Sequence, residues 1–218
     1  SSANGIGNAL DNTLYAGAGD NVLDGRAGVD TVSYLFAKAG VTVKLSTSAQ
    51  QDTIGSGIDT LKGTENLTGS RFDDFLTGNS ADNRLSGAEG NDTLTGGSGN
   101  DTLIGGAGVD TLIGGTGADR YVFNDIAEMG VGMRADIIQG FKTIEGDTLD
   151  LSAIDARPQT LASDAFNFIG SAAFSANNYG ELRFADGFLY GNIDGNAEPD
   201  FAIQLTGVQS LLSADIIL

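Results

Sequence analysis

The 218-residue sequence has no cysteine, no histidine and no tryptophan, and only two prolines. Without cysteine the chain cannot form a disulfide framework. Without histidine it cannot carry the zinc motif H-E-x-x-H, and Ser-His-Asp and Cys-His catalytic arrangements are excluded as well. No apolar run reaches the ~18 residues of a membrane-spanning helix. The opening residues SSANGIGNALDNTLYAG show no basic and apolar regions of a signal peptide.

Positive charge is also scarce, since 11 Lys and Arg face 29 Asp and Glu for a net charge of −18. A chain this acidic repels phosphate backbones, so we expect no nucleic-acid partner. The acids also repel one another unless cations neutralise them. Glycosidases use paired carboxylates, so composition alone leaves glycosidase activity open. Almost all clustered acids follow the repeat described next, however, so we expect no catalysis by this chain.

Glycine is abundant, with 33 residues, about twice the usual share of ~7%. Much of it belongs to seven consecutive nine-residue repeats over residues 60–122 of the form G-G-x-G-x-D-x-U-x, where U is apolar. The U positions are Leu67, Leu76, Leu85, Leu94, Leu103, Leu112 and Tyr121. The residues two before them are Glu65, Asp74, Asn83, Asp92, Asp101, Asp110 and Asp119.

Each repeat predicts a glycine-rich turn followed by a three-residue strand whose apolar residue points inward. One unit is too short to bury a core, so the units must stack, two to a coil. The sequence therefore predicts an all-β fold, a parallel β-roll with two blocks of repeats and an antiparallel β-rich C-terminal cap.

The turns predict a metal. Carboxylates and backbone carbonyls are hard oxygen ligands that suit calcium, whereas magnesium prefers a tighter shell that retains its waters. Transition metals lack their usual His and Cys ligands. This pattern is typical of calcium-binding solenoid repeats, and we expect several calcium ions and poor folding without them.

The predicted ligands are densest over residues 87–122. They are Gly87, Gly90, Asp92, Gly96, Gly97, Gly99, Asp101, Gly105, Gly106, Gly108, Asp110, Gly114, Gly115, Gly117 and Asp119. Units 69–77 and 78–86 have Phe72 and Ala81 in place of the fourth glycine, so Asp74 and Asn83 predict weaker sites. We expect unit 60–68 to be a capping coil.

A shorter block of repeats covers residues 1–33, with Leu14, Leu23 and Val32 nine residues apart. Amides replace two of its acids, so weaker sites are expected. The predicted ligands are Gly17, Gly19, Asn21, Gly28 and Asp30. Residues 34–59 break the register and predict a non-repetitive linking coil with one strand near Val41–Leu45.

Residues 123–218 predict the cap, with strands near 165–169, 180–185, 187–193 and 201–205. The loop 193–201 holds Asp194, Asn196 and Asp200, which predict either a further calcium site or an Asx-rich hairpin turn. Asp147 and Asp150 are similar candidates.

From about Gly78 to Leu218 the chain resembles the C-terminal domain of serralysin-type secreted metalloproteases, within the RTX (hemolysin-type calcium-binding repeat) proteins. The resemblance rests on the repeats and on GADRYVFNDIAE (117–128), ADIIQGF (135–141), GDTLDLSAID (146–155), DGNAEPDFAIQLTG (194–207) and SADIIL (213–218). It implies an extracellular module of a larger exported protein, with the catalytic part upstream. It also implies that a type I secretion ABC transporter reads the tail Asp215, Ile216, Ile217 and Leu218.

Three other functions stay open at this point. The chain could bind polysaccharide, as a module of an epimerase, or it could end a cell-surface adhesin. A third reading is ice binding by an outward ladder of Thr93, Thr102 and Thr111.

Overall fold

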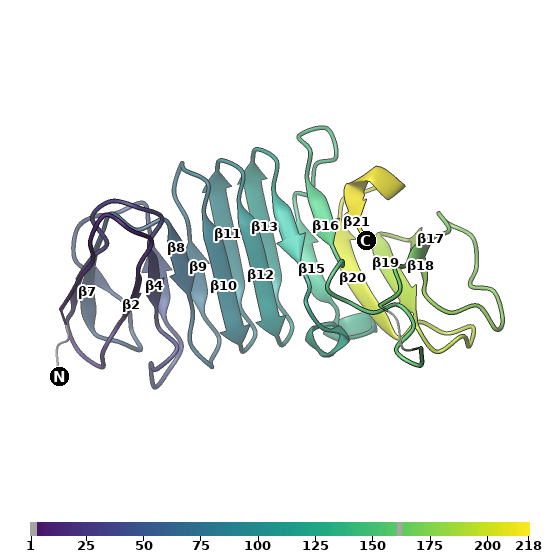
Figure 1. Ribbon diagram of the computed structural model, residues 1–218, viewed down its shortest axis with the longest axis horizontal. Helices are drawn as coiled ribbons and strands as arrows, with labels where there is room; N and C mark the ends of the chain where they lie inside the picture. Colours follow the sequence, from purple (N-terminus) through teal and green to yellow (C-terminus); the bar gives the residue numbers. More distant parts are fainter. Residues whose placement is uncertain (1–3, 161–162) are drawn as a thin grey trace.

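The computed structural model describes residues 4–160 and 163–218, so the first three residues of the first block lie outside the described part. The molecule is an elongated stack of short strands (Figure 1), and its described residues form no α-helix, only three single-turn 3-10 helices. These are η1 (Ile126–Glu128), η2 (Gly132–Arg134) and η3 (Ser213–Asp215). The prediction of an all-β parallel roll is therefore confirmed.

One sheet of eight strands runs the length of the molecule, and every neighbouring pair in it is parallel. Its order is β2 (Thr13–Tyr15), β4 (Thr31–Ser33), β8 (Asn66–Thr68), β10 (Arg84–Glu89), β12 (Thr102–Ala107), β14 (Arg120–Val122), β16 (Thr148–Asp150) and β21 (Ile216–Ile217). The last strand before the C-terminus thus pairs with β16, the second strand after the repeats.

The opposite face of the roll is divided into two sheets. Near the N-terminus lie β1 (Gly5–Ile6), β3 (Val22–Asp24), β7 (Ile58–Lys62) and β6 (Gln51–Asp52). The second sheet starts with β5 (Thr42–Lys44), β9 (Phe75–Thr77), β11 (Thr93–Ser98), β13 (Thr111–Thr116) and β15 (Asp136–Gln139), and it continues through β20 (Phe201–Thr206), β19 (Phe188–Asn192), β18 (Glu181–Ala185) and β17 (Asn167–Phe168).

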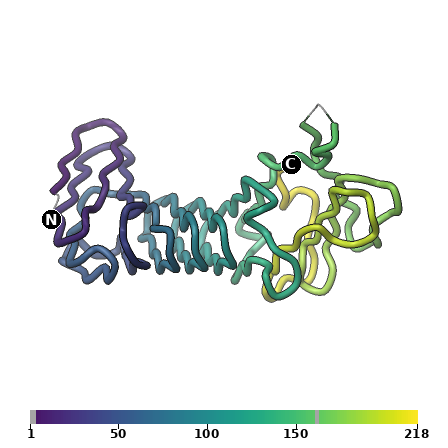
Figure 2. Tube along the Cα trace, turned by 90° about the horizontal axis from the view of Figure 1, so that it is seen from below, coloured from purple at the N-terminus to yellow at the C-terminus, as the bar shows by residue number. Residues whose placement is uncertain are grey.

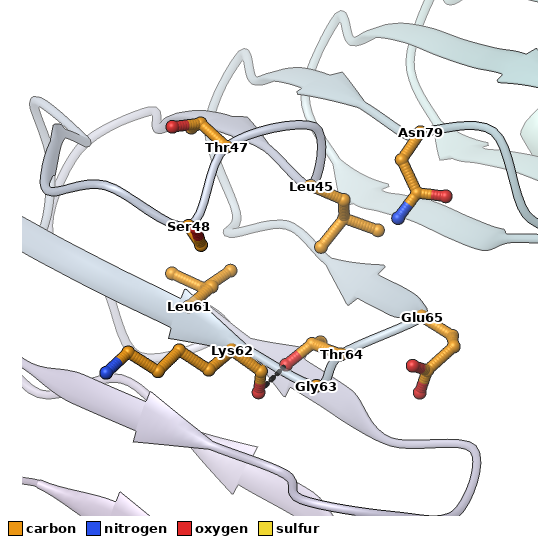
Figure 3. Close-up of a pocket in the computed structure, with 9 residues that line it drawn as sticks. All are labelled: Leu45, Thr47, Ser48, Leu61, Lys62, Gly63, Thr64, Glu65 and Asn79. Atoms are coloured by element: carbon orange, nitrogen blue, oxygen red, sulfur yellow. Dashed lines mark hydrogen bonds between the residues drawn. The ribbon is translucent and has the colours of Figure 1, made fainter.

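The division arises from the segment between the two blocks of repeats. Its β5 begins the second sheet beside β9, whereas its β7 joins the first sheet between β3 and β6. A shallow pocket lies at this division, lined by Leu45, Leu61 and the loop after Lys62 (Figure 3), and the Thr64 hydroxyl donates to the Lys62 carbonyl at its edge. The expectation that unit 60–68 caps the main roll is wrong, because β8 lies between β4 and β10 and joins the two blocks.

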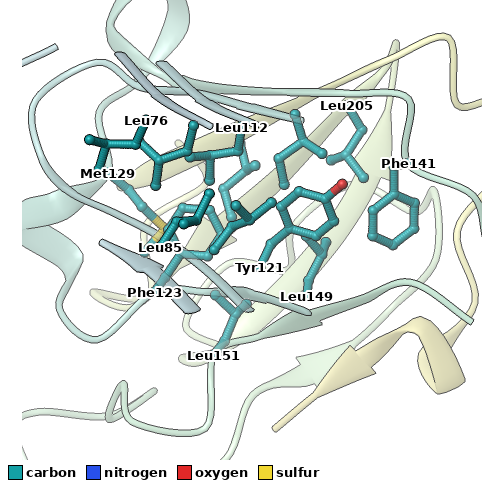
Figure 4. Packing of buried hydrophobic residues seen from close by; sticks show 14 of the residues in the cluster. Leu76, Leu85, Leu112, Tyr121, Phe123, Met129, Phe141, Leu149, Leu151 and Leu205 are labelled. Carbon is teal, nitrogen blue, oxygen red and sulfur yellow. The ribbon is translucent and has the colours of Figure 1, made fainter. Parts of the chain in front are cut away.

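The core is a column of inward apolar side chains between the two faces. Leu76, Leu85, Leu94, Leu103 and Leu112 are each at most 1% exposed. Their nine-residue spacing places successive members on opposite faces, so Leu94 is paired with Leu76 and Leu112 in register. The column continues into the cap through Tyr121, Leu149 and Leu205 (Figure 4), so repeats and cap share one core.

The cap extends the roll and also adds antiparallel strands. Strand β20 pairs parallel with β15, and β18–β19 and β19–β20 are antiparallel. Figure 2 shows the regular coils side by side between the first block and the cap. The metal-ligand candidates of the repeats lie in the turns of these coils.

Candidate calcium centres

The acidic residue of most repeats is buried, which is unusual for a carboxylate, and Glu65 is half-buried. Asp74, Asp92, Asp101, Asp110 and Asp119 are each at most 1% exposed, and Asn83 is 3% exposed. They lie immediately before the strands, where side chains alternate between the inside and the outside of the roll. Since the apolar residue two positions later points inward, the acid does so too, at the rim of the core.

These side chains form two hydrogen-bonded columns, one at each edge of the roll. In the first column, the backbone N–H groups of Asp74, Asp92 and Asp110 donate to Oδ1 of Asp92, Asp110 and Asp136, each at 2.8 Å. In the second column, the N–H groups of Asn83, Asp101 and Asp119 donate to Oδ1 of Asp101, Asp119 and Asp147, at 2.8–3.0 Å. We call each acid or amide of a column, with its hydrogen bond to the next coil, a rung. One carboxylate oxygen per rung therefore holds two coils in register.

The second carboxylate oxygen of most rungs is buried and accepts no hydrogen bond from the described residues. This holds for Oδ2 of Asp30, Asp92, Asp101, Asp110, Asp119 and Asp136. A buried anionic oxygen without a partner is costly. Its repetition on successive rungs indicates that each Oδ2 faces a cation.

The first glycine of each unit opens a slot beside that oxygen. A Cβ on Gly87 would lie less than 3.0 Å from Oδ2 of Asp92 and from the carbonyl oxygen of Gly105. A Cβ on Gly96 would meet Oδ2 of Asp101 and the Gly114 carbonyl in the same way. Gly105 and Gly114 likewise face Asp110 and Asp119. A side chain at Gly87 or Gly96 would fill the space where carboxylate and carbonyl oxygens converge, and one at Gly114 would meet Oδ2 of Asp119 and the Tyr121 hydroxyl.

The other predicted glycines shape the turn. Most of those at the second and fourth positions have positive φ, which favours glycine. These glycines are Gly28, Gly90, Gly97, Gly99, Gly106, Gly108, Gly115 and Gly117, with φ between +101° and +149°. Two non-glycine residues take positive φ at the second position, Arg26 at +75° and Ala88 at +86°, whereas Gly17 and Gly19 do not have positive φ.

The raised pKa values of the buried aspartates also indicate a cation at these oxygens. Burial raises the pKa of Asp92 and Asp136 to about 8, and neighbouring carboxylates add to the rise. Burial also raises the pKa of Asp101 and Asp110 to about 6, and that of Asp74, Asp119 and Asp147 above the usual range. These acids therefore resist ionisation in the fold unless positive charge is supplied.

The donor set fits calcium. It consists of carboxylate and carbonyl oxygens, with no nitrogen or sulfur ligand. Within residues 4–160 and 163–218, no three acidic side chains converge as a ready metal cluster, so backbone carbonyls have to supply much of the shell. Calcium accepts such a shell of 6–8 oxygens at about 2.3–2.6 Å.

Two residues of this system, Asp59 and Asp136, were not predicted from the sequence. Asp136 receives the Asp110 N–H and ends the first column, although it follows the repeats. Asp59 is fully buried and its Oδ1 accepts the N–H of Asn21 at 2.8 Å, so it acts as the next rung above that amide. Both precede an inward apolar residue by two, Leu61 and Ile138, and this short signature could have found them.

The first block has its own rungs. The N–H of Asn12 donates to Oδ1 of Asp30 at 2.7 Å, and the N–H of Asp30 donates to Glu65 at 2.8 Å. At Asn21 the amide Nδ2 donates to the Gly17 carbonyl, to the Gly19 carbonyl and to Asp59. In the main block the Asn83 Nδ2 donates to the Glu65 carbonyl at 2.7 Å. At Asn21 and Asn83 an amide nitrogen therefore lies against oxygens of the turns.

The loop 193–201 has the geometry of Asx turns. Oδ1 of Asp194 accepts the N–H of Asn196, Oδ1 of Asn196 accepts the N–H of Glu198, and Oδ2 of Asp200 accepts the N–H of Ile193. Asp194 and Asn196 are exposed. The side-chain oxygens of this loop thus serve its own backbone.

Asp150 takes part in an ion pair rather than a column. It accepts from Arg120 and from the Ser152 hydroxyl and N–H. Burial opposes ionisation, but these hydrogen bonds outweigh it and keep the pKa of Asp150 below its usual value.

The threonine ladder predicted from the sequence is wrong. Thr93 pairs with Thr111 across β11 and β13, but Thr102 lies on β12 in the opposite sheet, beside Arg84 and Arg120. The physical reason is the coil of two units, which places residues nine apart on opposite faces.

Comparison with known proteins agrees with the repeats. The profile of the RTX calcium-binding nonapeptide repeat (four copies) matches residues 6–34, 60–94 and 86–121. No curated protein sequence gives a significant match.

Two solved structures are similar over much of the chain. The AlgE6R3 subunit of the mannuronan C5-epimerase from Azotobacter vinelandii is 28% identical, with a TM-score of 0.49, over 67% of this chain and 78% of that one. The extracellular lipase LipA from Serratia marcescens is 18% identical, with a TM-score of 0.41, and this chain spans 40% of the lipase's length. The profile match identifies the repeats of this chain as RTX calcium-binding nonapeptide repeats, and the pairing of their strands forms a parallel β-roll.

Proposed function

We propose that this chain is a non-catalytic module that folds on extracellular calcium and directs type I secretion of a larger exported protein. The observation that carries the calcium part is the series of buried, unpartnered Oδ2 atoms along both columns. Without a cation each oxygen opposes folding, and with one it becomes a ligand. Binding energy is then folding energy.

Low calcium inside the cell would leave the acidic chain unfolded and able to thread a transporter. Millimolar calcium outside would fold it, which suits sites with Kd of about 10⁻⁴–10⁻³ M. RTX repeats occur in secreted proteins, and among the described residues no helix is long and apolar enough to cross a membrane.

The tail supports the secretion part through its position. In the folded chain, β21 pairs with β16, Ile216 is buried, and Oδ2 of Asp215 accepts the N–H of Leu212 at 2.7 Å. A transporter could read residues 215–218 only before they enter the sheet. Folding outside the cell would then also hide the signal.

The test is export of the full chain from a Gram-negative host with a type I transporter. Deletion of residues 215–218 should abolish most export, and Asp215→Asn, which keeps the acceptor for Leu212, should reduce it. Asp186→Asn removes one acid from an exposed turn and is the matched control. Unchanged export of the deletion variant would contradict the secretion role, whereas the calcium role is measured separately on the purified chain.

A further inference from the structure

A lysine lies against the last complete repeat. The Nζ of Lys142 donates to the carbonyl of Gly115 at 2.8 Å and to Glu145 at 3.1 Å. Glu145 in turn accepts the N–H of Gly117 at 3.2 Å. Gly115 and Gly117 are the second and fourth residues of unit 114–122, the unit of Asp119.

Asn21 shows what carbonyls at these two positions face in unit 16–24, whose glycines lack the positive φ of Gly115 and Gly117. Its Nδ2 lies between the carbonyls of Gly17 and Gly19, the second and fourth residues of that unit, and Oδ1 of Asp59 on the next coil. This is a place where oxygens from two coils converge. In unit 114–122 the corresponding carbonyl of the second residue is taken by the Lys142 ammonium.

The acid of the next coil differs accordingly. Both oxygens of Asp147 accept backbone hydrogen bonds, from Asp119 at 3.0 Å and from Lys142 at 2.7 Å. At the end of the other column, Oδ2 of Asp136 is buried and accepts none from the described residues. The two columns thus end differently. In the second, backbone N–H groups satisfy both oxygens of the final acid Asp147, and the Lys142 ammonium lies on the Gly115 carbonyl without a bond to the unpartnered Oδ2 of Asp119. In the first, Oδ2 of the final acid Asp136 is itself unpartnered.

We propose that the Lys142 ammonium is a built-in cation that takes the place of calcium at the last rung of the second column. The final acid of this column, Asp147, therefore needs no metal, while the first column ends in an oxygen that requires one. This inference rests on the proposed calcium binding of the repeats. It assigns Lys142 the role of limiting how many ions the roll holds.

The first test is lysine acetylation of the calcium-saturated chain, read by peptide mass spectrometry. The chain has four lysines, and Lys38, Lys44 and Lys62 are exposed. Lys142 should react at least about tenfold more slowly than these, because its ammonium is held by charge-assisted hydrogen bonds. If calcium occupies the place instead, Lys142 is displaced and reacts as fast as the other three, which would overturn the proposal.

The second test counts bound calcium by native mass spectrometry. Lys142→Met should bind one calcium ion more per chain than the unmodified protein, while Lys142→Arg and the surface control Lys44→Met should bind the same number. An unchanged count in Lys142→Met also overturns the proposal. If the unmodified chain binds no calcium at all, the proposed function itself fails, and the count tells these two failures apart.

Discussion

At the scale of single residues, the two carboxylate oxygens of each aspartate in the columns have different roles. Oδ1 of Asp110 accepts the N–H of Asp92, and Oδ2 is buried and unpartnered. One oxygen therefore fixes the coils and the other faces the metal. This division explains why an acid, rather than an amide, dominates the sixth position of units 87–122.

Loss of such a carboxylate should weaken calcium-dependent folding. Asp101→Ala and Asp110→Ala should lower the free energy of unfolding in saturating calcium by at least about 1.5–3 kcal/mol, the worth of one charge-assisted hydrogen bond. Asn12→Ala, in the weaker block, should cost less. Asp110→Asn keeps the acceptor for Asp92, so it should lower calcium affinity with less disturbance of the turn. Urea unfolding at fixed calcium checks the order, and an Asn12→Ala loss equal to that of Asp110→Ala would contradict it.

The turn at Ala88 offers a gain of stability. Its φ of +86° is strained for a residue with a side chain. Ala88→Gly should therefore raise the free energy of unfolding in calcium by up to about 1 kcal/mol, the strain relieved less the added chain entropy. Ala107→Gly, at the third position of its unit and without positive φ, should instead cost about 0.5–1 kcal/mol. Thermal melts of both variants measure the two signs, and stabilisation by Ala107→Gly would refute the strain argument.

At the scale of elements, the repeats were predictable because local spacing determines them. Leu94, Leu103 and Leu112 repeat with the period of the turn and strand, so the inward column followed directly from the sequence. Asp59 and Asp136 were missed because insertions place them out of the nine-residue phase. Only the pairing of β7 with β3 and of β15 with β13 brings them onto the columns.

The joining segment and the Thr ladder show a second limit of the sequence. Which sheet a strand enters depends on how many half-coils precede it, and a non-repetitive insertion resets that count. Strand β8 therefore joins the blocks instead of capping one, and Thr102 lies opposite Thr93. Contacts such as Lys142 with Gly115 lie 27 residues apart and have no periodic signal.

The buried acids of the columns also predict that rising pH has opposite effects on two quantities. It lowers the stability of the metal-free roll and raises its affinity for calcium. Burial raises the pKa of Asp92 to about 8 and of Asp101 to about 6 in the fold, above the unfolded value of about 3.9. The folded state therefore binds more protons, so the metal-free roll is most stable below about pH 4 and loses stability as pH rises towards 8. Calcium competes with these protons, so its affinity should rise over the same window.

Circular dichroism in metal-free buffer from pH 8 down to pH 5 measures this response. We expect β-structure to increase as pH falls, and Asp92→Asn to make the dependence on pH shallower. A metal-free chain that gains structure on going from pH 5 to pH 8 would contradict the role given to the buried acids.

At the scale of the whole molecule, the acidic composition and the fold depend on each other. A net charge of −18 opposes compaction, and many of the acids lie in two buried or half-buried columns rather than on the surface. On the proposed function, the same charge that opposes folding without metal would become the ligand set when metal binds. The cap, whose core continues that of the roll, should fold together with it.

The most direct test of this account is the circular dichroism spectrum of the full chain at pH 7, first in chelator and then through a titration to millimolar calcium. The account predicts a largely unfolded spectrum in chelator and a cooperative gain of β-structure with calcium, with little response to magnesium at equal concentration. A β-rich spectrum that is already complete in chelator and does not change across the titration would contradict the central claim.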